Sequence, residues 1–296
     1  DNDKENVSKI FKQIGCDVDE DKVAISPMRA KLALQYIFGL FKPSILVAHK
    51  PNYKSTIDAA VMNYGHTLAE VDVRGRYSSL FHEVRKQSSE HKDKPIILLL
   101  VCPHNPTAIS MNNEEEQEFH ALVQDVPNLS VIHDIAYQGY HTSYRDAGKI
   151  YRDFGMPHKN QMYIAILSTS KSIYASGQPA FWFSDKNSFP FLVDHYERMA
   201  TGPTSTFVHD LPYYYETLDD EYMRSVENNL QIPLIQFIEY NKEKWGIDFW
   251  IKPDGPPFIT LDISEKLNEL NMCDNSFRDL TLLLGCPVLV NNGCLR

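Results

Sequence analysis

The sequence has few cysteines, and their pattern suits neither a metal site nor a disulfide framework. Five occur among 296 residues, an odd number, far apart and without a CxxC or His-rich ligand spacing. We therefore expect no metal centre, and unpaired thiols favour a reducing compartment such as the cytoplasm. The five are Cys16, Cys102, Cys273, Cys286 and Cys294.

Long apolar runs and an excess of basic charge are also missing. No apolar run reaches the roughly 18 residues of a membrane span, and no basic-then-apolar leader opens the chain. The chain has 29 basic and 39 acidic residues, a formal net charge of −10, which opposes binding to a phosphate backbone. We therefore expect neither a membrane nor a nucleic acid as partner, and small molecules are favoured.

Strand-like and helix-like segments alternate through the first two thirds of the chain. Such alternation predicts an α/β fold of three layers, with a mostly parallel central sheet, helices on both faces and a ligand at the carboxyl ends of the strands. The expected strands are 23–25, 44–50, 67–73, 95–101, 129–137 and 162–168, and the expected helices are 4–14, 30–41, 53–64, 77–87 and 114–126.

The composition changes after about residue 191, which predicts a large domain at 1–190 and a smaller α/β domain at 191–296. In the second part we expect a long helix over about 212–245, interrupted near Pro233, then a Pro/Gly turn and an alternating strand at 250–263. The abrupt start and end suggest that pieces before Asp1 and after Arg296 are missing.

Lys171 lies at the end of an apolar strand, after Ser168, Thr169 and Ser170. An amine held in a dry pocket has a pKa below its usual ~10.4 and becomes a nucleophile that forms a Schiff base with an aldehyde. The neighbouring hydroxyls can donate to a phosphate. A lysine after a strand is also an ordinary solvated residue, so this segment alone leaves both interpretations open.

A second polar cluster lies where the helix at 30–41 begins. Free backbone N–H groups at a helix start favour an anion, and Ser26, Arg29 and Lys31 are placed to join them. A capped helix with two solvated cations is an equally good interpretation of this segment by itself.

Three motifs together resemble the fold-type I pyridoxal phosphate (PLP) enzymes, specifically the class I/II aminotransferases. HNPTA at 104–108 resembles the family's Asn-Pro-Thr-Gly turn, DIAYQGY at 134–140 its Asp-x-x-Tyr motif, and STSK at 168–171 its Ser-x-Ser-Lys motif. The intervals between them each suit one strand-helix-strand unit. The resemblance covers nearly the whole chain, without the family's N-terminal arm and last C-terminal strand and helix.

The resemblance implies PLP as cofactor and a role for each matching residue. Lys171 forms the Schiff base, Asp134 pairs with the pyridine nitrogen, and Asn105 and Tyr137 hydrogen-bond the phenolate oxygen. Tyr53 stacks on the ring, and Arg296, together with Asn105, binds the substrate carboxylate. The residues expected around the cofactor phosphate are Ser26, Met28, Arg29, Ala30, Ser168 and Ser170.

The activity implied is transfer of an α-amino group from an amino acid to a 2-oxo acid by a homodimer. One departure concerns the phosphate: the family's Gly-x-Arg is replaced here by Gly177-Gln178-Pro179, so we expect Arg29 to supply the missing charge. Ala108 in place of the motif's glycine is a lesser departure. Other PLP chemistry (lyase, cyclase or oxidase) and a non-catalytic relative that has lost PLP, or keeps it only as a structural ligand, remain open.

Overall fold

The structure is a computed structural model that describes most of the first 184 residues and part of the rest. The described ranges are 2–13, 16, 18–26, 29–138, 156–172, 180–184, 232–255 and 258–273, together with residue 276 and isolated positions between 210 and 229.

A seven-stranded sheet forms the centre of the fold, in the order β1-β7-β6-β5-β4-β2-β3. The five strands from β2 to β6 run parallel to one another, while β7 is antiparallel to both β6 and β1. The predicted mostly parallel sheet is therefore confirmed. The strands are β1 Val23–Ser26, β2 Ile45–Lys50, β3 Thr67–Asp72, β4 Ile96–Val101, β5 Leu129–Asp134, β6 Tyr163–Ser168 and β7 Ala180–Ser184.

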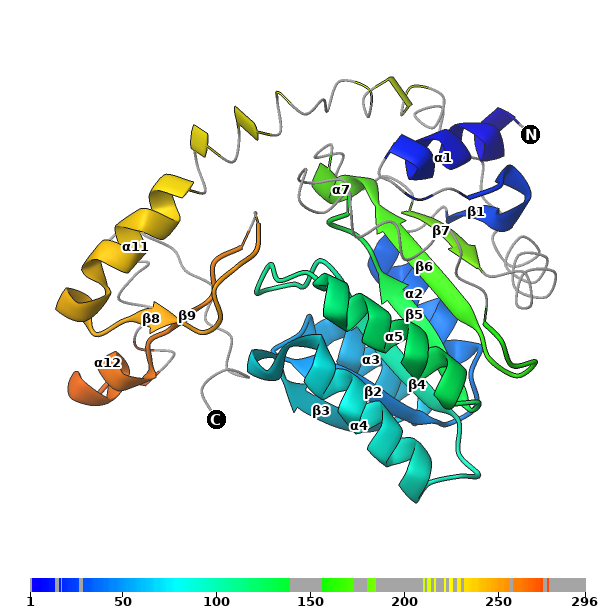
Figure 1. Ribbon diagram of the computed structural model, residues 1–296, viewed down its shortest axis with the longest axis horizontal. Coiled ribbons are helices and arrows are strands. Elements are labelled where there is room, and N and C mark those ends of the chain that lie inside the picture. The colour runs from blue at the N-terminus through cyan, green and yellow to red at the C-terminus, as the bar shows by residue number, and fades with distance from the viewer. Residues whose placement is uncertain are drawn as a thin grey trace.

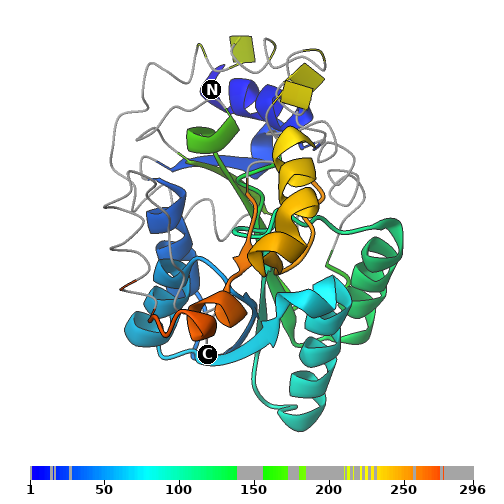
Figure 2. The same ribbon diagram turned by 90° about the vertical axis from the view of Figure 1, so that its left-hand side faces the viewer.

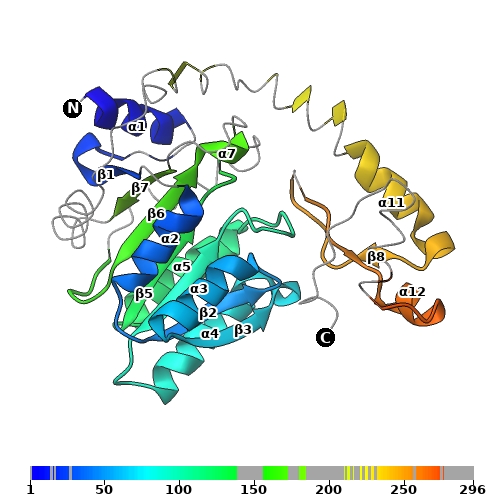
Figure 3. The same cartoon turned by 180° about the vertical axis from the view of Figure 1, so that it is seen from behind.

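Helices cover both faces of this sheet, which gives the three expected layers (Figures 1, 2 and 3). Helices α1, α4 and α5 pack on one face, and α2 and α3 pack on the other. The helices of this part are α1 Asn2–Gln13, α2 Ala30–Gly39, α3 Lys54–Tyr64, α4 Arg76–Glu90, α5 Asn113–Asp125 and the single turn α7 Thr169–Ser172, with short 3-10 turns η1 Glu20–Lys22 and η2 Val73–Gly75.

The central strands are apolar without alternation because both of their faces are buried. Every residue of β4 and β6 is buried, and their side chains point alternately into the two cores. Leu98 belongs to the core under α4 and α5, whereas its neighbours Ile97 and Leu99 belong to the core under α2 and α3. This double burial fixes the register of the strands and therefore the positions of their ends.

Local signals set the ends of several helices. Helix α3 stops at Gly65, which adopts a left-handed conformation with φ of 70°, as its place in the sequence predicted. Helix α5 starts with a capping box in which Asn112 and Glu115 exchange side-chain-to-backbone hydrogen bonds. The described helices include none that is long and apolar enough to cross a membrane.

The C-terminal elements lie to one side of the large sheet (Figures 1 and 3). They comprise α11 Ile232–Trp245, the two-stranded β8 Asp248–Phe249 and β9 Leu261–Asp262, and α12 Ser264–Glu269. The described part of α11 begins at Ile232, next to residues outside the described ranges, so the expected interruption near Pro233 stays a prediction. The strand expected after the Pro/Gly turn is short, since only Leu261 and Asp262 pair with β8.

Candidate functional site

Residues 104–110, here called the Asn105 turn, connect β4 to α5 and fold tightly on themselves. The amide of Ala108 donates to the carbonyl of His104 at 2.7 Å, and the amide of His104 donates to the carbonyl of Ile109 at 2.8 Å. The Tyr77 hydroxyl donates to the carbonyl of Val101 at 2.7 Å, at the end of β4. These hydrogen bonds therefore fix the backbone that carries Asn105.

Ala108 is more than a lesser departure from the family's motif. It has a φ of 55°, in the left-handed region that glycine adopts freely and that costs an alanine about 1–2 kcal/mol. The conformation explains why the resembling motif carries glycine at this position. The surrounding turn has to hold the alanine in place.

Three of the predicted site residues converge at the carboxyl ends of β4, β5 and β6. The Asn105 side-chain amide donates through Nδ2 to the hydroxyl of Tyr137 across 3.5 Å, so these two polar groups lie together. The Lys171 amine lies 5.9 Å from the centroid of the Tyr137 ring. Tyr137 itself is only 4 % exposed and follows β5 in a turn, whereas we expected it within the strand.

Asp134 is the last residue of β5, next to this group. Asp134 is partly buried, and desolvation of its carboxyl group raises the pKa of Asp134 to about 6, although the Ala136 N–H and the charge of Lys171 favour the ionised form. A desolvated carboxylate of this kind is suited to a cationic partner. Lys171 is exposed at the first turn of α7, so the dry pocket expected around its amine is not formed by the described residues.

The predicted phosphate residues lie along the neighbouring strand ends. Ser26 and Ser168 both pair with Ala180 of β7, so that their backbones lie in one row across the sheet, and both are buried. The amide of Ser170 donates to Ser168 Oγ at 3.3 Å. These hydroxyls come from segments far apart in sequence.

Helix α2 starts close by, directly after β1. Arg29 is its N-cap residue and is exposed, and the Arg29 side chain makes no capping hydrogen bond. A helix start beside buried hydroxyls is a suitable environment for a phosphate.

Of the remaining predicted residues, the structure describes only Tyr53. Tyr53 is the N-cap of α3 and 52 % exposed, and no described contact joins it to Asn105, Asp134 or Lys171. Met28, Pro179 and Arg296 lie outside the described residues, so their predicted roles stay predictions.

The sequence did not single out a C-terminal segment that reaches the site. The ring of Phe258 stands edge-on to that of Tyr137, with the centroids 5.0 Å apart. The Thr260 hydroxyl donates to the carbonyl of Pro106 at 2.6 Å, and the Asp254 amide donates to the carbonyl of Ala108 at 3.0 Å. No local sequence pattern predicts these contacts.

Polar atoms without partners lie at the carboxyl ends of β2 and β4. Asn52 Nδ2, Ser55 Oγ and His104 Nε2 are buried and make no hydrogen bond within the chain. Buried polar atoms are normally paired, so this edge has unused hydrogen-bonding capacity.

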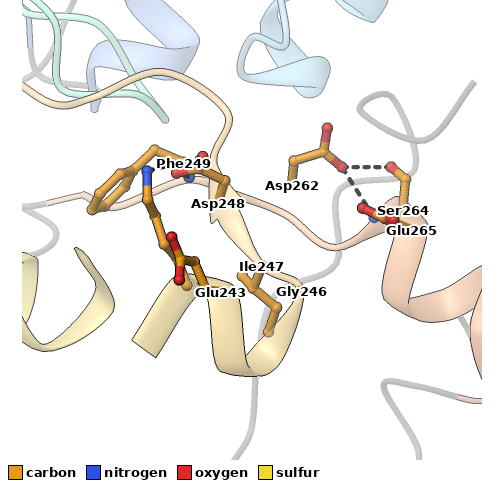
Figure 4. Close-up of a pocket in the computed structure, with 9 residues that line it drawn as sticks. Glu243, Gly246, Ile247, Asp248, Phe249, Asp262, Ser264 and Glu265 are labelled. Carbon is orange, nitrogen blue, oxygen red and sulfur yellow. Dashed lines mark hydrogen bonds and ion pairs between the residues drawn. The ribbon is translucent and has the colours of Figure 1, made fainter. Parts of the chain in front are cut away.

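Two hollows in the described part of the chain lie away from these residues. One, of about 460 Å³, is lined by the end of α11 and by β8, β9 and α12, and Figure 4 shows Asp262 in it, bonded to Ser264. Its acidic lining includes Glu243, Asp248 and Glu265. None of the residues that converge at the strand ends lines it.

The donor set at the strand ends fits pyridoxal phosphate. A desolvated carboxylate suits a protonated ring nitrogen, two neighbouring polar groups suit a phenolate oxygen, an amine suits an aldehyde, and hydroxyls at a helix start suit a phosphate. The doubly covered, mostly parallel sheet is that of the fold-type I PLP-dependent enzymes.

Sequence comparison identifies the family of the chain. The family described as aminotransferase class I and II matches residues 12–226, and the chain belongs to this PLP-dependent family. No curated protein is significantly similar to it in sequence.

Solved structures share the fold at low sequence identity. The apo structure of BacF from Bacillus subtilis has 17% identity and a TM-score of 0.75, over 99% of this chain and 77% of that one. A PLP-bound C-S lyase from Staphylococcus hominis has 15% identity and a TM-score of 0.76, over 98% of this chain and 75% of that one. An aspartate aminotransferase from Thermotoga maritima has 19% identity and a TM-score of 0.73, over 99% of this chain and 74% of that one.

Desolvation of the Asp134 carboxyl predicts a pH-dependent effect of Asp134→Asn on cofactor-free protein. Because the folded pKa of about 6 lies above the ordinary value of 3.8, the folded state binds the proton more tightly. The wild type should therefore lose up to about 3 kcal/mol of unfolding free energy between pH 4 and pH 7, and the asparagine variant should not.

Urea unfolding of both proteins at several pH values measures this difference. Asp125→Asn, which removes an exposed carboxyl at the end of α5, controls for the loss of one charge. If the difference in unfolding free energy between wild type and Asp134→Asn stays constant from pH 4 to pH 7, the Asp134 carboxyl is not desolvated.

Proposed function

We propose that this chain is the cofactor-binding part of an aminotransferase that moves the α-amino group of an amino acid to a 2-oxo acid. The observation that carries the proposal is the convergence of Asn105, Tyr137 and Lys171 beside the desolvated carboxyl of Asp134. PLP, when bound, supplies an aldehyde for the substrate amine and a ring that takes up electrons from the substrate Cα.

Lys171 is the catalytic residue in this proposal. Its amine would hold the cofactor through the cofactor's aldehyde and, when free, would remove and return the proton at the substrate Cα. Asp134, as a carboxylate, keeps the ring nitrogen protonated. A cation at this position would lower the pKa of Asp134 from about 6 and so favour the charged form at neutral pH.

The other residues hold and orient. Tyr137 and Asn105, whose polar groups lie together, would donate to the phenolate oxygen. The phosphate would be received by Ser26, Met28, Arg29, Ser168, Ser170 and the first amide of α2, at Ala30. Tyr53 stacks on the ring, and Arg296 and Asn105 bind the substrate carboxylate, for which an arginine offers two parallel hydrogen bonds.

A lyase reaction is the second candidate, favoured by the fold shared with the C-S lyase at a TM-score of 0.76. Both reactions begin with loss of the Cα proton, so the residues at the strand ends serve either. They differ in the fate of the amino group, which reaches a 2-oxo acid in one case and is released as ammonia in the other. A relative without catalysis would make neither product.

Lys171→Ala tests the function directly. The wild type loaded with PLP should show visible absorbance that borohydride abolishes and should convert an amino acid and a 2-oxo acid into the exchanged pair. The variant should lose both properties while keeping its circular dichroism, because an exposed lysine contributes little to packing.

Lys159→Ala, which removes an exposed lysine just before β6, is the matched control and should keep both properties. Full turnover by Lys171→Ala would disprove the assignment. Release of ammonia in place of amino transfer by the wild type would establish the lyase instead.

Arg29 has a separate test. A PLP phosphate carries close to two negative charges and a helix start offers only about half a compensating charge, so a nearby cation should contribute to binding. Arg29→Ala should weaken PLP binding by roughly 1.5–3 kcal/mol, about tenfold to more than a hundredfold, in a titration of cofactor-free protein.

Lys31→Ala is the control, since the two side chains point about 200° apart around the helix axis. Equal PLP affinities of Arg29→Ala and wild type would show that the hydroxyls and helix amides bind the phosphate without Arg29.

We also propose that the protein works as a cytoplasmic homodimer with a large domain at 1–190 and a smaller one at 191–296. Homodimers are the commonest closed assemblies, and enzymes of the resembling family build each site at a subunit interface. Sedimentation velocity should give a dimer at micromolar concentration. A monomer at that concentration contradicts this part of the proposal.

A further inference from the structure

Asp254 joins the C-terminal segment, residues 250–255 and 258–260, to the Asn105 turn. Its carboxylate oxygen Oδ2 accepts from the backbone N–H of Ser110 at 2.9 Å, and its own N–H donates to the carbonyl of Ala108 at 3.0 Å. Asp254 is thus hydrogen-bonded to the residues on both sides of Ile109. Residues 108–110 form the end of the Asn105 turn.

A partly exposed ion pair joins the same carboxylate oxygen of Asp254 to Arg76. Arg76 Nη2 lies 3.3 Å from Asp254 Oδ2 and 3.2 Å from Glu115 Oε2, and it donates to the carbonyl of Ser110 at 2.7 Å. The Glu115 side chain is only 4 % exposed and also accepts from the amides of Tyr77 and Asn112. Arg76 therefore ties Asp254 to the starts of α4 and α5.

The same C-terminal segment makes two further contacts of different kinds. Thr260 bonds the carbonyl of Pro106, the residue after Asn105, and the guanidinium of Arg74 lies 4.3 Å from the centroid of the Trp250 ring. Phe258, between Asp254 and Thr260, meets the ring of Tyr137. Asp254 and Thr260 thus hold the Asn105 turn from both ends.

We propose that Asp254 is a positioning residue for the cofactor site. It fixes the Asn105 turn through Ser110 and Ala108, and so keeps the Asn105 amide facing the Tyr137 hydroxyl. The turn depends on these hydrogen bonds because Ala108 has a positive φ, a strained conformation that persists only while the surrounding contacts maintain it. The link to PLP rests on the proposed function; the effect on the turn does not.

Hydrogen exchange in cofactor-free protein tests the effect on the turn. Asp254→Ala should speed exchange in a peptide covering residues 104–111 by at least about tenfold, because the Ser110 N–H loses its acceptor. Asp254→Asn, which keeps an oxygen acceptor, should restore most of the protection. The control Asp248→Ala removes a carboxylate of the same C-terminal part whose partners among the described residues are Lys242 and the amide of Phe249, and it should leave the peptide unchanged.

A double-mutant cycle in PLP titrations tests the link to the site. Asp254→Ala should weaken PLP binding about tenfold in the wild-type background and less than twofold in Asn105→Ala, because it acts through Asn105. Asp254→Asn should bind PLP nearly as wild type does. The hydrogen-exchange measurement does not use the Asn105→Ala variant, so it tests the effect of Asp254 on the turn even if that variant does not fold.

Three results would overturn the proposal: wild-type exchange rates in Asp254→Ala, faster exchange with unchanged PLP affinity, or additive effects in the cycle. A wild type that binds no PLP would overturn the proposed function instead, and the exchange rates would still decide whether Asp254 holds the turn.

Discussion

Burial of the central strands on both faces is the constraint on which the rest of the structure depends. Because β2, β4, β5 and β6 contribute side chains to two cores at once, none can slide without exposing one apolar face and burying the wrong residues in the other. Their carboxyl ends are therefore held in line. The amide of Cys102 also donates to the carbonyl of Asp134 at 3.2 Å, which joins two of these ends directly.

Glu115 and Asp134, two carboxylates in the region of the large sheet, differ in how far the surrounding residues compensate their charge. Glu115 accepts from an arginine and two backbone amides, so its charge is fully compensated within the chain. Asp134 has one backbone N–H and a lysine charge, and burial still raises its pKa to about 6. A carboxylate left short of partners in this way costs folding free energy and retains capacity for a ligand.

The sequence was sufficient wherever the signal was local. Apolar runs gave the strands, Gly65 gave the end of α3, and polar residues at strand ends gave Asn105, Asp134 and Lys171 as neighbours. It was insufficient wherever a contact joins distant segments. Asp254 lies in the predicted Pro/Gly turn and Thr260 in the alternating strand predicted after it, and neither pattern indicates partners in a turn about 150 residues away. The antiparallel placement of β7 between β1 and β6 likewise has no local signature.

The row formed by Ser26, Ala180 and Ser168 has a consequence for the order in which the protein assembles. Neighbouring parallel strands such as β4 and β5 can pair after closing a loop of one helix, whereas β1 has to wait for β7, which follows it by more than a hundred residues. Closing long loops costs more entropy and slows folding. The part of the site around Asn105 and Asp134 is therefore available early in folding, and the part around Ser26 is among the last to form. Tight cofactor binding would then report completion of the sheet, so that a newly made chain acquires its ligand only after its earliest strand has found its place.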